Sequence, residues 1–176
     1  MVPIVPTKIS YVVPDYLEQV VRRVQRLKEQ PSHSERAHES LVEEFFQAIG
    51  YEKDREIKYR QGRMDVSIWD GKNPLLVVEV KPDWGLTQYK DPRVIQQAYN
   101  YALSHGVRYV AVTNGDYYAL FDRLKGLSYS SNCIAEFSLT ALEEEDLTVI
   151  NQMKRSNLTK PDLEGLFRHL SESFRA

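Results

Sequence analysis

The charged residues that stand out in this sequence are Glu79 and Lys81, which follow a run of aliphatic residues in the segment LLVVEVK. The aliphatic run predicts a strand that is buried on both faces. Alternate side chains of a strand share a face, so the carboxylate and the ammonium are expected to point the same way. Burying such a pair without partners would be costly. The pair therefore indicates either the exposed end of a strand or a polar site.

A second carboxylate, Asp65, lies in the preceding strand-like segment and is separated from Glu79 by thirteen residues. If DGKN forms the turn between the two strands, Asp65 and Glu79 come close on adjacent strands. Neighbouring carboxylates repel unless a cation lies between them, and Mg²⁺ prefers oxygen ligands. We therefore expect a Mg²⁺ site, with Mn²⁺ as a substitute, whose ligands are Asp65, Glu79 and the carbonyl of Val80. Lys81 would then orient water and stabilise charge on a phosphate.

Two helices are expected before these strands. Apolar residues recur at helical spacing between Pro14 and Glu29, and again between Ser34, a plausible cap, and Gly50. Strand-like runs then follow at 55–60, 63–69 and 75–81, with turn residues at Gly62 and DGKN, which predicts an antiparallel meander.

A further helix is expected in DPRVIQQAYNYALSHG, followed by two strands in VRYVAVTNGDYYALFDR that join at an Asn-Gly turn. The tail segments SLTALEEEDLTVINQMK and KPDLEGLFRHLSESF predict two more helices. The predicted fold class is α/β, with a central mixed sheet flanked by helices.

Composition excludes several classes of protein. The 176 residues, 42% of them hydrophobic, fit one globular domain, and 23 Lys and Arg against 25 Asp and Glu leave the charge nearly balanced. The single cysteine, Cys133, excludes an internal disulfide, and the proline-interrupted amino terminus predicts neither a signal peptide nor a membrane span. We therefore expect a cytoplasmic protein without a membrane partner.

A locally basic segment, KDREIKYRQGR, immediately precedes Met64 and Asp65. Positive side chains beside a metal site suit contacts to DNA phosphates, which give affinity without sequence information. The expected DNA-binding residues are Lys58, Arg60 and Arg63. An ordinary solvated strand face is the alternative interpretation of this charge strip.

The order Asp, spacer, Glu-x-Lys on a hairpin resembles the PD-(D/E)XK nuclease superfamily. The motif stands here as GRMDVSIWDGKNPLLVVEVK, without the proline that gives the superfamily its name. The upstream SERAHESLVEEFFQAIGY looks like the helix that supplies an extra acidic residue. The downstream QQAYNYA matches the Gln-x-x-x-Tyr signature of the amino-terminal nuclease domain of type I restriction-enzyme R subunits, and GVRYVAVTNGDYYALFD also looks like that family.

The resemblance implies roles for further residues. Gln97 and Tyr101 occupy the two signature positions, four residues apart on one helix face, and would support Lys81 or the backbone of the target. Tyr101 also fits the apolar pattern of an ordinary packing residue. The extra acid is Glu39 or Glu35: Glu39 has the expected spacing from Gly50, whereas Glu35 lies closer to the apolar stripe. We favour Glu39.

The resemblance covers residues 34–122 as a restriction-endonuclease-like core, with residues 1–33 as an amino-terminal arm and helix and residues 123–176 as a helical extension within a single domain. It implies a Mg²⁺-dependent deoxyribonuclease, a hydrolase of restriction-modification or DNA processing. DNA is the expected partner, together with a partner protein or a second copy of the chain. No G-x-x-x-x-G-K-[ST] loop occurs, so no nucleotide cofactor is expected. The alternatives are a catalytically weak nuclease-fold module that binds DNA or protein, and a structural domain with a surface Glu-Lys pair.

Overall fold

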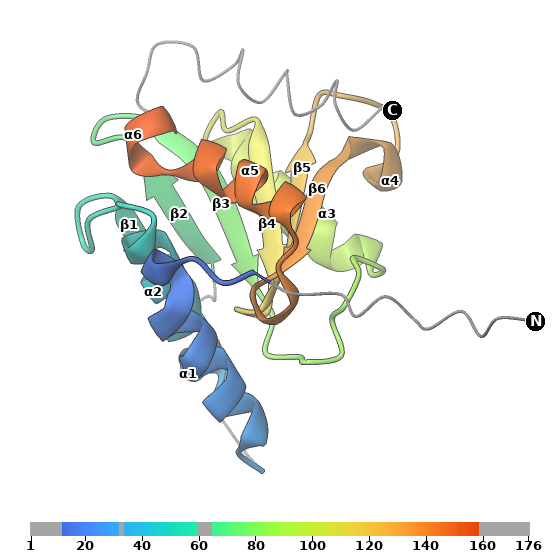
Figure 1. Cartoon of the computed structure of the whole chain (residues 1–176). Helices are drawn as coiled ribbons and strands as arrows, with labels where there is room; N and C mark the ends of the chain where they lie inside the picture. Colours follow the sequence, from blue (N-terminus) through green and yellow to red (C-terminus); the bar gives the residue numbers. More distant parts are fainter. Residues whose placement is uncertain (1–11, 32–33, 60–64, 159–176) are drawn as a thin grey trace, which may run out of the picture.

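The centre of the structure is a six-stranded mixed sheet (Figure 1). The computed structural model describes residues 12–31, 34–59 and 65–158, and the side chains of Asp65 and Leu158 lie outside that description. The strands are β1 (Ile57–Tyr59), β2 (Asp65–Trp69), β3 (Pro74–Val80), β4 (Tyr109–Thr113), β5 (Tyr117–Asp122) and β6 (Cys133–Ser138), and they follow one another across the sheet in this order. Neighbouring strands are antiparallel except for β3 and β4, which are parallel. The α/β fold with a restriction-endonuclease-like core is confirmed.

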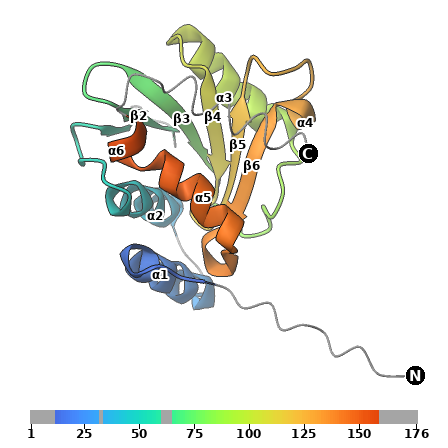
Figure 2. The same ribbon diagram turned by 45° about the horizontal axis from the view of Figure 1, so that its top comes forward.

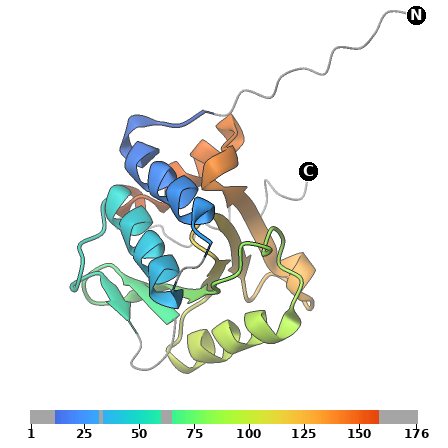
Figure 3. The same ribbon diagram turned by 90° about the horizontal axis from the view of Figure 1, so that it is seen from below.

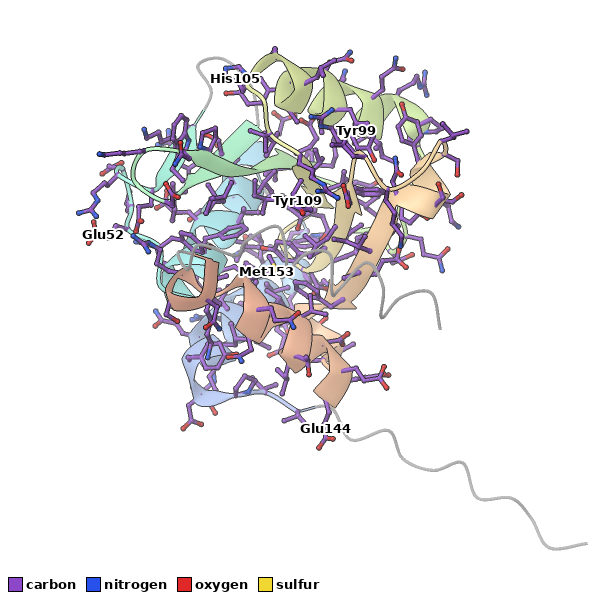
Figure 4. All side chains as sticks on the ribbon, turned by 90° about the horizontal axis from the view of Figure 1, so that it is seen from above. Glu52, Tyr99, His105, Tyr109, Glu144 and Met153 are labelled. Atoms are coloured by element: carbon purple, nitrogen blue, oxygen red, sulfur yellow. The ribbon has the colours of Figure 1, made fainter. Side chains whose placement is uncertain are left out.

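Helices cover both faces of this sheet. The described helical segments are η1 (Asp15–Leu17), α1 (Glu18–Glu29), α2 (Glu35–Ala48), α3 (Pro92–Ser104), α4 (Tyr129–Asn132), η2 (Leu139–Ala141), α5 (Glu144–Met153) and α6 (Arg155–Leu158). Figures 2 and 3 show α1 and α2 on the face opposite α3. Figure 4 likewise shows Tyr99 of α3 and His105, which follows α3, on one side of the strands and Glu144 and Met153 of α5 on the other. None of the described helices is long and apolar enough to cross a membrane.

Strand β3 is buried on both faces, as the aliphatic run predicted. Leu76, Val78 and Val80 belong to the apolar core under α1, α2 and α5, whereas Val77 belongs to the core under α3. This alternation places Glu79 on the α3 face. The parallel step from β3 to β4 is made through α3, the type of crossover that parallel neighbours need.

The turn between β2 and β3 forms at the expected DGKN segment. The Oδ1 atom of Asp70 accepts hydrogen bonds from the backbone N–H groups of Lys72 (3.2 Å) and Asn73 (2.9 Å), and Gly71 takes a φ of +100°. This local hydrogen bonding is typical of turn-forming Asp and Gly. The expected cap is also present, because the Ser34 hydroxyl accepts a hydrogen bond from the N–H of Ala37.

The turn between β4 and β5 is centred one residue later than the Asn-Gly pair itself. The backbone N–H of Asn114 bonds to the carbonyl of Tyr117, so Gly115 and Asp116 are the two central residues. Gly115 has a φ of +92°, as the first central position of a type II′ turn requires. A Cβ atom at this glycine would lie 3.0 Å from the Cβ of Leu41, so α2 packs directly on the turn.

The expectation of a purely helical extension after residue 122 is wrong. Residues 133–138 form β6, which pairs antiparallel with β5 and completes the sheet, and Cys133 is a buried residue of this strand. The segment predicted as one long helix from Ser138 contains only η2 and α5 as helix. The predicted last helix, which begins near Pro161, lies outside the described residues.

Candidate active site

Asp65 and Glu79 lie directly opposite each other in the antiparallel pair of β2 and β3. The hairpin through Asp70 sets this register, and the ladder continues from it with Val66 opposite Val78 and Ser67 opposite Val77. Residues opposed in this way occupy the same face of a sheet. The predicted closeness of the two acidic residues on adjacent strands is therefore confirmed at the level of the backbone.

Glu79 and Lys81 are in direct contact, as expected for residues two apart on a strand. The Nζ atom of Lys81 lies 2.9 Å from the Oε1 atom of Glu79, and the Glu79 side chain is 7% exposed against 31% for Lys81. The carboxylate is thus buried beside a cation that remains partly open to solvent. A buried charge needs such a partner, and this contact explains how the strand tolerates it.

This charged pair lies where β3 and β4 end. The backbone N–H of Lys81 donates to the carbonyl of Thr113, the last residue of β4, at 2.8 Å. In open α/β sheets, ligands bind in the crevice outside the carboxyl ends of such strands. The position of Glu79 and Lys81 in the sheet is therefore typical of a ligand-binding or catalytic site.

The amino-terminal half of α2 lies at the same end of the sheet. The buried ring of His38 is hydrogen-bonded through Nδ1 to the carbonyl of Asn114 (2.7 Å) and packs on Trp84, with 4.3 Å between ring centroids. Burial, and after it the hydrogen bond to Glu43, raise the pKa of Tyr59 at the end of β1, and the charge of Glu39 makes a smaller contribution in the same direction. Glu39 is therefore within electrostatic reach of Tyr59. The helix thus spans from the end of β1 to the turn between β4 and β5.

Glu39 and Glu35 have different surroundings. Glu39 is half-buried, and burial raises its pKa; the charge of Glu35 adds to the rise and that of Arg36 opposes it. Glu35, in the first turn of α2, is exposed. A half-buried carboxyl at this end of the sheet suits the extra acid better than an exposed one. The participation of either residue in the site stays a prediction.

The cap residue of α3, Asp91, interacts electrostatically with Lys81. Hydrogen bonds from the backbone and side chain of Arg93 hold the pKa of Asp91, the cap of α3, below its ordinary value, and the charge of Lys81 contributes to the same effect. Asp91 is therefore within electrostatic reach of the ammonium. The charge of the proposed catalytic lysine therefore reaches the start of the helix that carries the Gln-x-x-x-Tyr signature.

Gln97 and Tyr101 lie on one flank of α3. The other flank faces β5, because the ring of Tyr99 contacts that of Phe121 at 6.3 Å between centroids. Gln97 and Tyr101, each two residues from Tyr99, lie on nearly the opposite side of the helix, away from β5. Gln97 is exposed, whereas Tyr101 is half-buried against the apolar core. The ring of Tyr101 also packs on that of His105, 4.2 Å away between centroids, so Tyr101 has the packing role that the apolar pattern predicted, and a role for Gln97 or Tyr101 in the site stays a prediction.

One of the three expected DNA-binding residues, Lys58, can be placed in the structure. Its ammonium lies 4.0 Å from the ring centroid of Trp69, and the indole N–H of Trp69 donates to Ser67 Oγ at 2.9 Å. Lys58 is opposite Ser67, two residues along β2 from Asp65, so it shares the face of Glu79. Arg60 and Arg63 lie outside the described residues. Trp69, which the sequence analysis did not single out, thus positions the Lys58 ammonium by packing.

The proposed donor set contains only oxygen atoms. A carboxylate of Asp65, a carboxylate of Glu79 and the carbonyl of Val80 fit Mg²⁺ or Mn²⁺ rather than a softer metal. Among the side chains that the structure describes, no three His, Cys, Asp or Glu groups could hold a metal ion together. The side chain of Asp65 is not among those described, so the proposed donor set includes one group outside them.

The mixed sheet, the parallel crossover through α3 and the Asp65–Glu79–Lys81 arrangement at the strand ends define a restriction-endonuclease-like α/β domain. A family model described as "Type I restriction enzyme R protein N terminus (HSDR_N)" matches residues 40–137, more than half of the 176 residues. The chain belongs to this family. Comparisons with curated proteins and with solved structures find no match. The family associates the chain with type I restriction, and its model extends to β6, beyond residue 122 where the resemblance had ended.

Proposed function

We propose that the chain is a Mg²⁺-dependent DNA endonuclease domain of the PD-(D/E)XK superfamily that hydrolyses phosphodiester bonds in restriction. The observation that carries the proposal is the register of β2 and β3, which sets Asp65 opposite Glu79 beside Lys81. Family membership supports the assignment to restriction. We also propose the cytoplasm as the location, in line with the single free cysteine and the DNA substrate.

Each member of the catalytic set has a separate role in this proposal. Asp65, Glu79 and the Val80 carbonyl hold Mg²⁺, which supplies Lewis-acid stabilisation of the phosphate when it is bound. Lys81 orients the attacking water and stabilises the negative charge that develops on the phosphate oxygens. The Glu79 carboxylate would serve both Lys81 and the ion, and the partly exposed ammonium of Lys81 would be able to turn toward the substrate.

The surrounding residues assist this set. Glu39 is the proposed extra acid, with Glu35 as the alternative, and its raised pKa fits a carboxyl that is stabilised when a cation arrives. Gln97 and Tyr101 support Lys81 or the target backbone from the flank of α3. Lys58, with Arg60 and Arg63, contacts the phosphates of DNA, and the remaining subunits of a restriction complex are the proposed protein partners.

The direct test combines metal binding with cleavage. Isothermal titration with Mg²⁺ or Mn²⁺ should show one binding event in the wild type, and supercoiled or linear DNA should be nicked only when the metal is present. Asp65→Asn and Glu79→Gln should lose both properties. The matched control is Glu144→Gln, an exposed carboxyl at the start of α5. A wild type that binds no metal at millimolar concentration would contradict the proposal.

A second candidate is a nuclease-fold module that binds DNA or a protein partner without cleaving. The observation in its favour is the contact between Lys81 and Glu79, which gives the buried carboxylate a cation of its own within the chain. DNA binding that is unchanged by Mg²⁺, together with no cleavage of any DNA form, would favour this module over the enzyme.

A further inference from the structure

The sequence predicted the Asn-Gly segment only as a turn. In the structure, its Asn114 also bonds to the loop that follows Lys81 of the candidate site. We propose that Asn114 is a positioning residue that fixes Lys81 by holding residues 82–90, the loop between β3 and α3. The catalytic part of this inference rests on the proposed nuclease function. Asn114 itself is 2% exposed and touches neither Glu79 nor Lys81 through any side-chain bond that the structure describes.

The amide of Asn114 donates twice to the loop. Its Nδ2 atom lies 2.9 Å from the carbonyl oxygen of Asp83 and 3.1 Å from that of Leu86. Asp83 is two residues after Lys81, so the first bond fixes the chain immediately beyond the lysine. The second bond fixes the far side of the bend that contains Gly85.

The other half of the side chain fixes Asn114 in its own turn. Its Oδ1 atom accepts from the backbone N–H groups of Asp116 (2.9 Å) and Tyr117 (2.8 Å), and its carbonyl is bonded to His38 of α2. The amide nitrogen therefore donates two hydrogen bonds and the amide oxygen accepts two. Since the group is buried, water cannot replace any of these bonds without opening the structure.

The same hairpin holds the loop at two further points. The N–H of Lys81 donates to Thr113 at 2.8 Å, and the N–H of Tyr89 donates to the hydroxyl of Tyr117 at 3.0 Å. Thr113, Asn114 and Tyr117 thus contact the loop at its start, middle and end. Loops are usually less precise supports than strands, and catalytic groups tolerate little displacement. These contacts join the segment after Lys81 to the hairpin at several points.

Two variants separate this role from turn formation. Asn114→Ser keeps a short acceptor for the turn but removes the amide group that donates both hydrogen bonds to the loop, and it adds no charge. Asn114→Asp also keeps the acceptor and places a carboxylate against two carbonyl oxygens. Asn132→Asp is the matched control: Asn132 is also buried, accepts from the N–H of Gly126 and donates to the hydroxyl of Tyr99, and none of these bonds involves residues 82–90.

The readouts are amide hydrogen exchange in residues 82–90 and the NMR signal of the Lys81 Cε atom in [13Cε]lysine-labelled protein, assigned with Lys81→Arg. In Asn114→Ser and Asn114→Asp we expect exchange in the loop to be faster by about tenfold or more and the Lys81 signal to shift or broaden. We also expect kcat for DNA nicking to fall by roughly 10- to 100-fold while KM stays within about threefold, the result of a displaced catalytic group. Asn132→Asp should leave both loop readouts at their wild-type values.

The outcomes for the two proposals are distinct. Loop exchange and a Lys81 signal identical to wild type in both Asn114 variants would overturn the role of Asn114, whatever the protein cleaves. An unchanged kcat despite a loosened loop would overturn it as well. A wild type without metal-dependent cleavage would overturn the proposed function and the catalytic part of this inference, while the exchange and NMR data would still decide whether Asn114 holds the Lys81 segment.

Discussion

The ammonium of Lys81 lies 2.9 Å from a carboxylate oxygen of Glu79, and the two residues differ in exposure, 31% against 7%. The lysine is therefore the solvent-facing member of the pair, and the glutamate is the buried member that would lose this contact if the lysine were removed. This difference allows the structural role of Lys81 to be measured separately from its catalytic role.

Lys81→Met should destabilise the protein in the absence of metal and abolish cleavage. Breaking a fully buried pair costs roughly 3–5 kcal/mol, and the partial exposure of Lys81 reduces the expected loss to about 1–2 kcal/mol. Mg²⁺ should restore much of this stability, because it neutralises Glu79, but it should not restore cleavage. Urea unfolding with and without Mg²⁺ and a nicking assay measure both effects. Lys72→Met, at an exposed turn position, is the control; a Lys81→Met protein that cleaves at the wild-type rate would contradict the assigned role.

Glu39 should titrate above the ordinary carboxyl range, because burial raises its pKa. A raised pKa means that the folded protein holds this proton more tightly than the unfolded chain. The contribution to stability is therefore full below the unfolded pKa and is lost as pH rises through the folded pKa. NMR titration of the side chain should show the elevated value, and Mg²⁺ should lower it if Glu39 belongs to the site.

Comparison of Glu39→Gln with Glu35→Gln then identifies the extra acid. We expect Glu39→Gln to weaken Mg²⁺ binding by about tenfold, whereas Glu35→Gln, at an exposed position, should leave the affinity unchanged. The reverse order of effects in isothermal titration would assign the role to Glu35 instead.

Arg155 of α6 should contribute to stability through a distant carboxylate. It forms an ion pair with Glu56, whose side chain is only 2% exposed and which also accepts a hydrogen bond from the N–H of Glu52. Arg155→Met should therefore lower the free energy of unfolding by about 2–4 kcal/mol, because it leaves a buried carboxylate without its cation. The double variant with Glu56→Gln should recover part of the loss in urea unfolding. Equal stabilities of the wild type and Arg155→Met would refute this account.

Lys58→Ala should weaken DNA binding without altering which sequences are bound. A single phosphate contact contributes slightly less than one unit to the slope of log K against log salt, so the slope should fall by about 0.9 for duplex DNA. Fluorescence anisotropy across a series of salt concentrations measures this change, with Lys72→Ala as the exposed control. A slope equal to that of the wild type would remove Lys58 from the DNA contact.

The strand β6 illustrates what could not be predicted from the sequence. Its segment CIAEFS is short, and apolar and charged residues at helical spacing follow it, so local patterns favoured a helical tail. The segment becomes a strand because β5 offers it an unpaired edge, with Ala135 opposite Leu120 and Phe137 opposite Tyr118. Strand formation of this kind depends on a partner elsewhere in the chain rather than on local preference.

The sequence by itself determined the elements whose interactions are local. The cap at Ser34, the turn at DGKN and the opposition of Asp65 to Glu79 depend on residues close together in the chain, and a hairpin with a defined turn sets its own register. Only the tertiary structure decided which distant groups meet. Lys28 pairs with Asp116, Arg155 pairs with Glu56, and Asn114 bonds to the loop after Lys81, contacts that link residues 88, 99 and 31 positions apart. The physical reason is that such contacts are selected by burial: each polar group enclosed by the packing of helices on the sheet must find a partner there, and no local pattern specifies which residue the fold will supply.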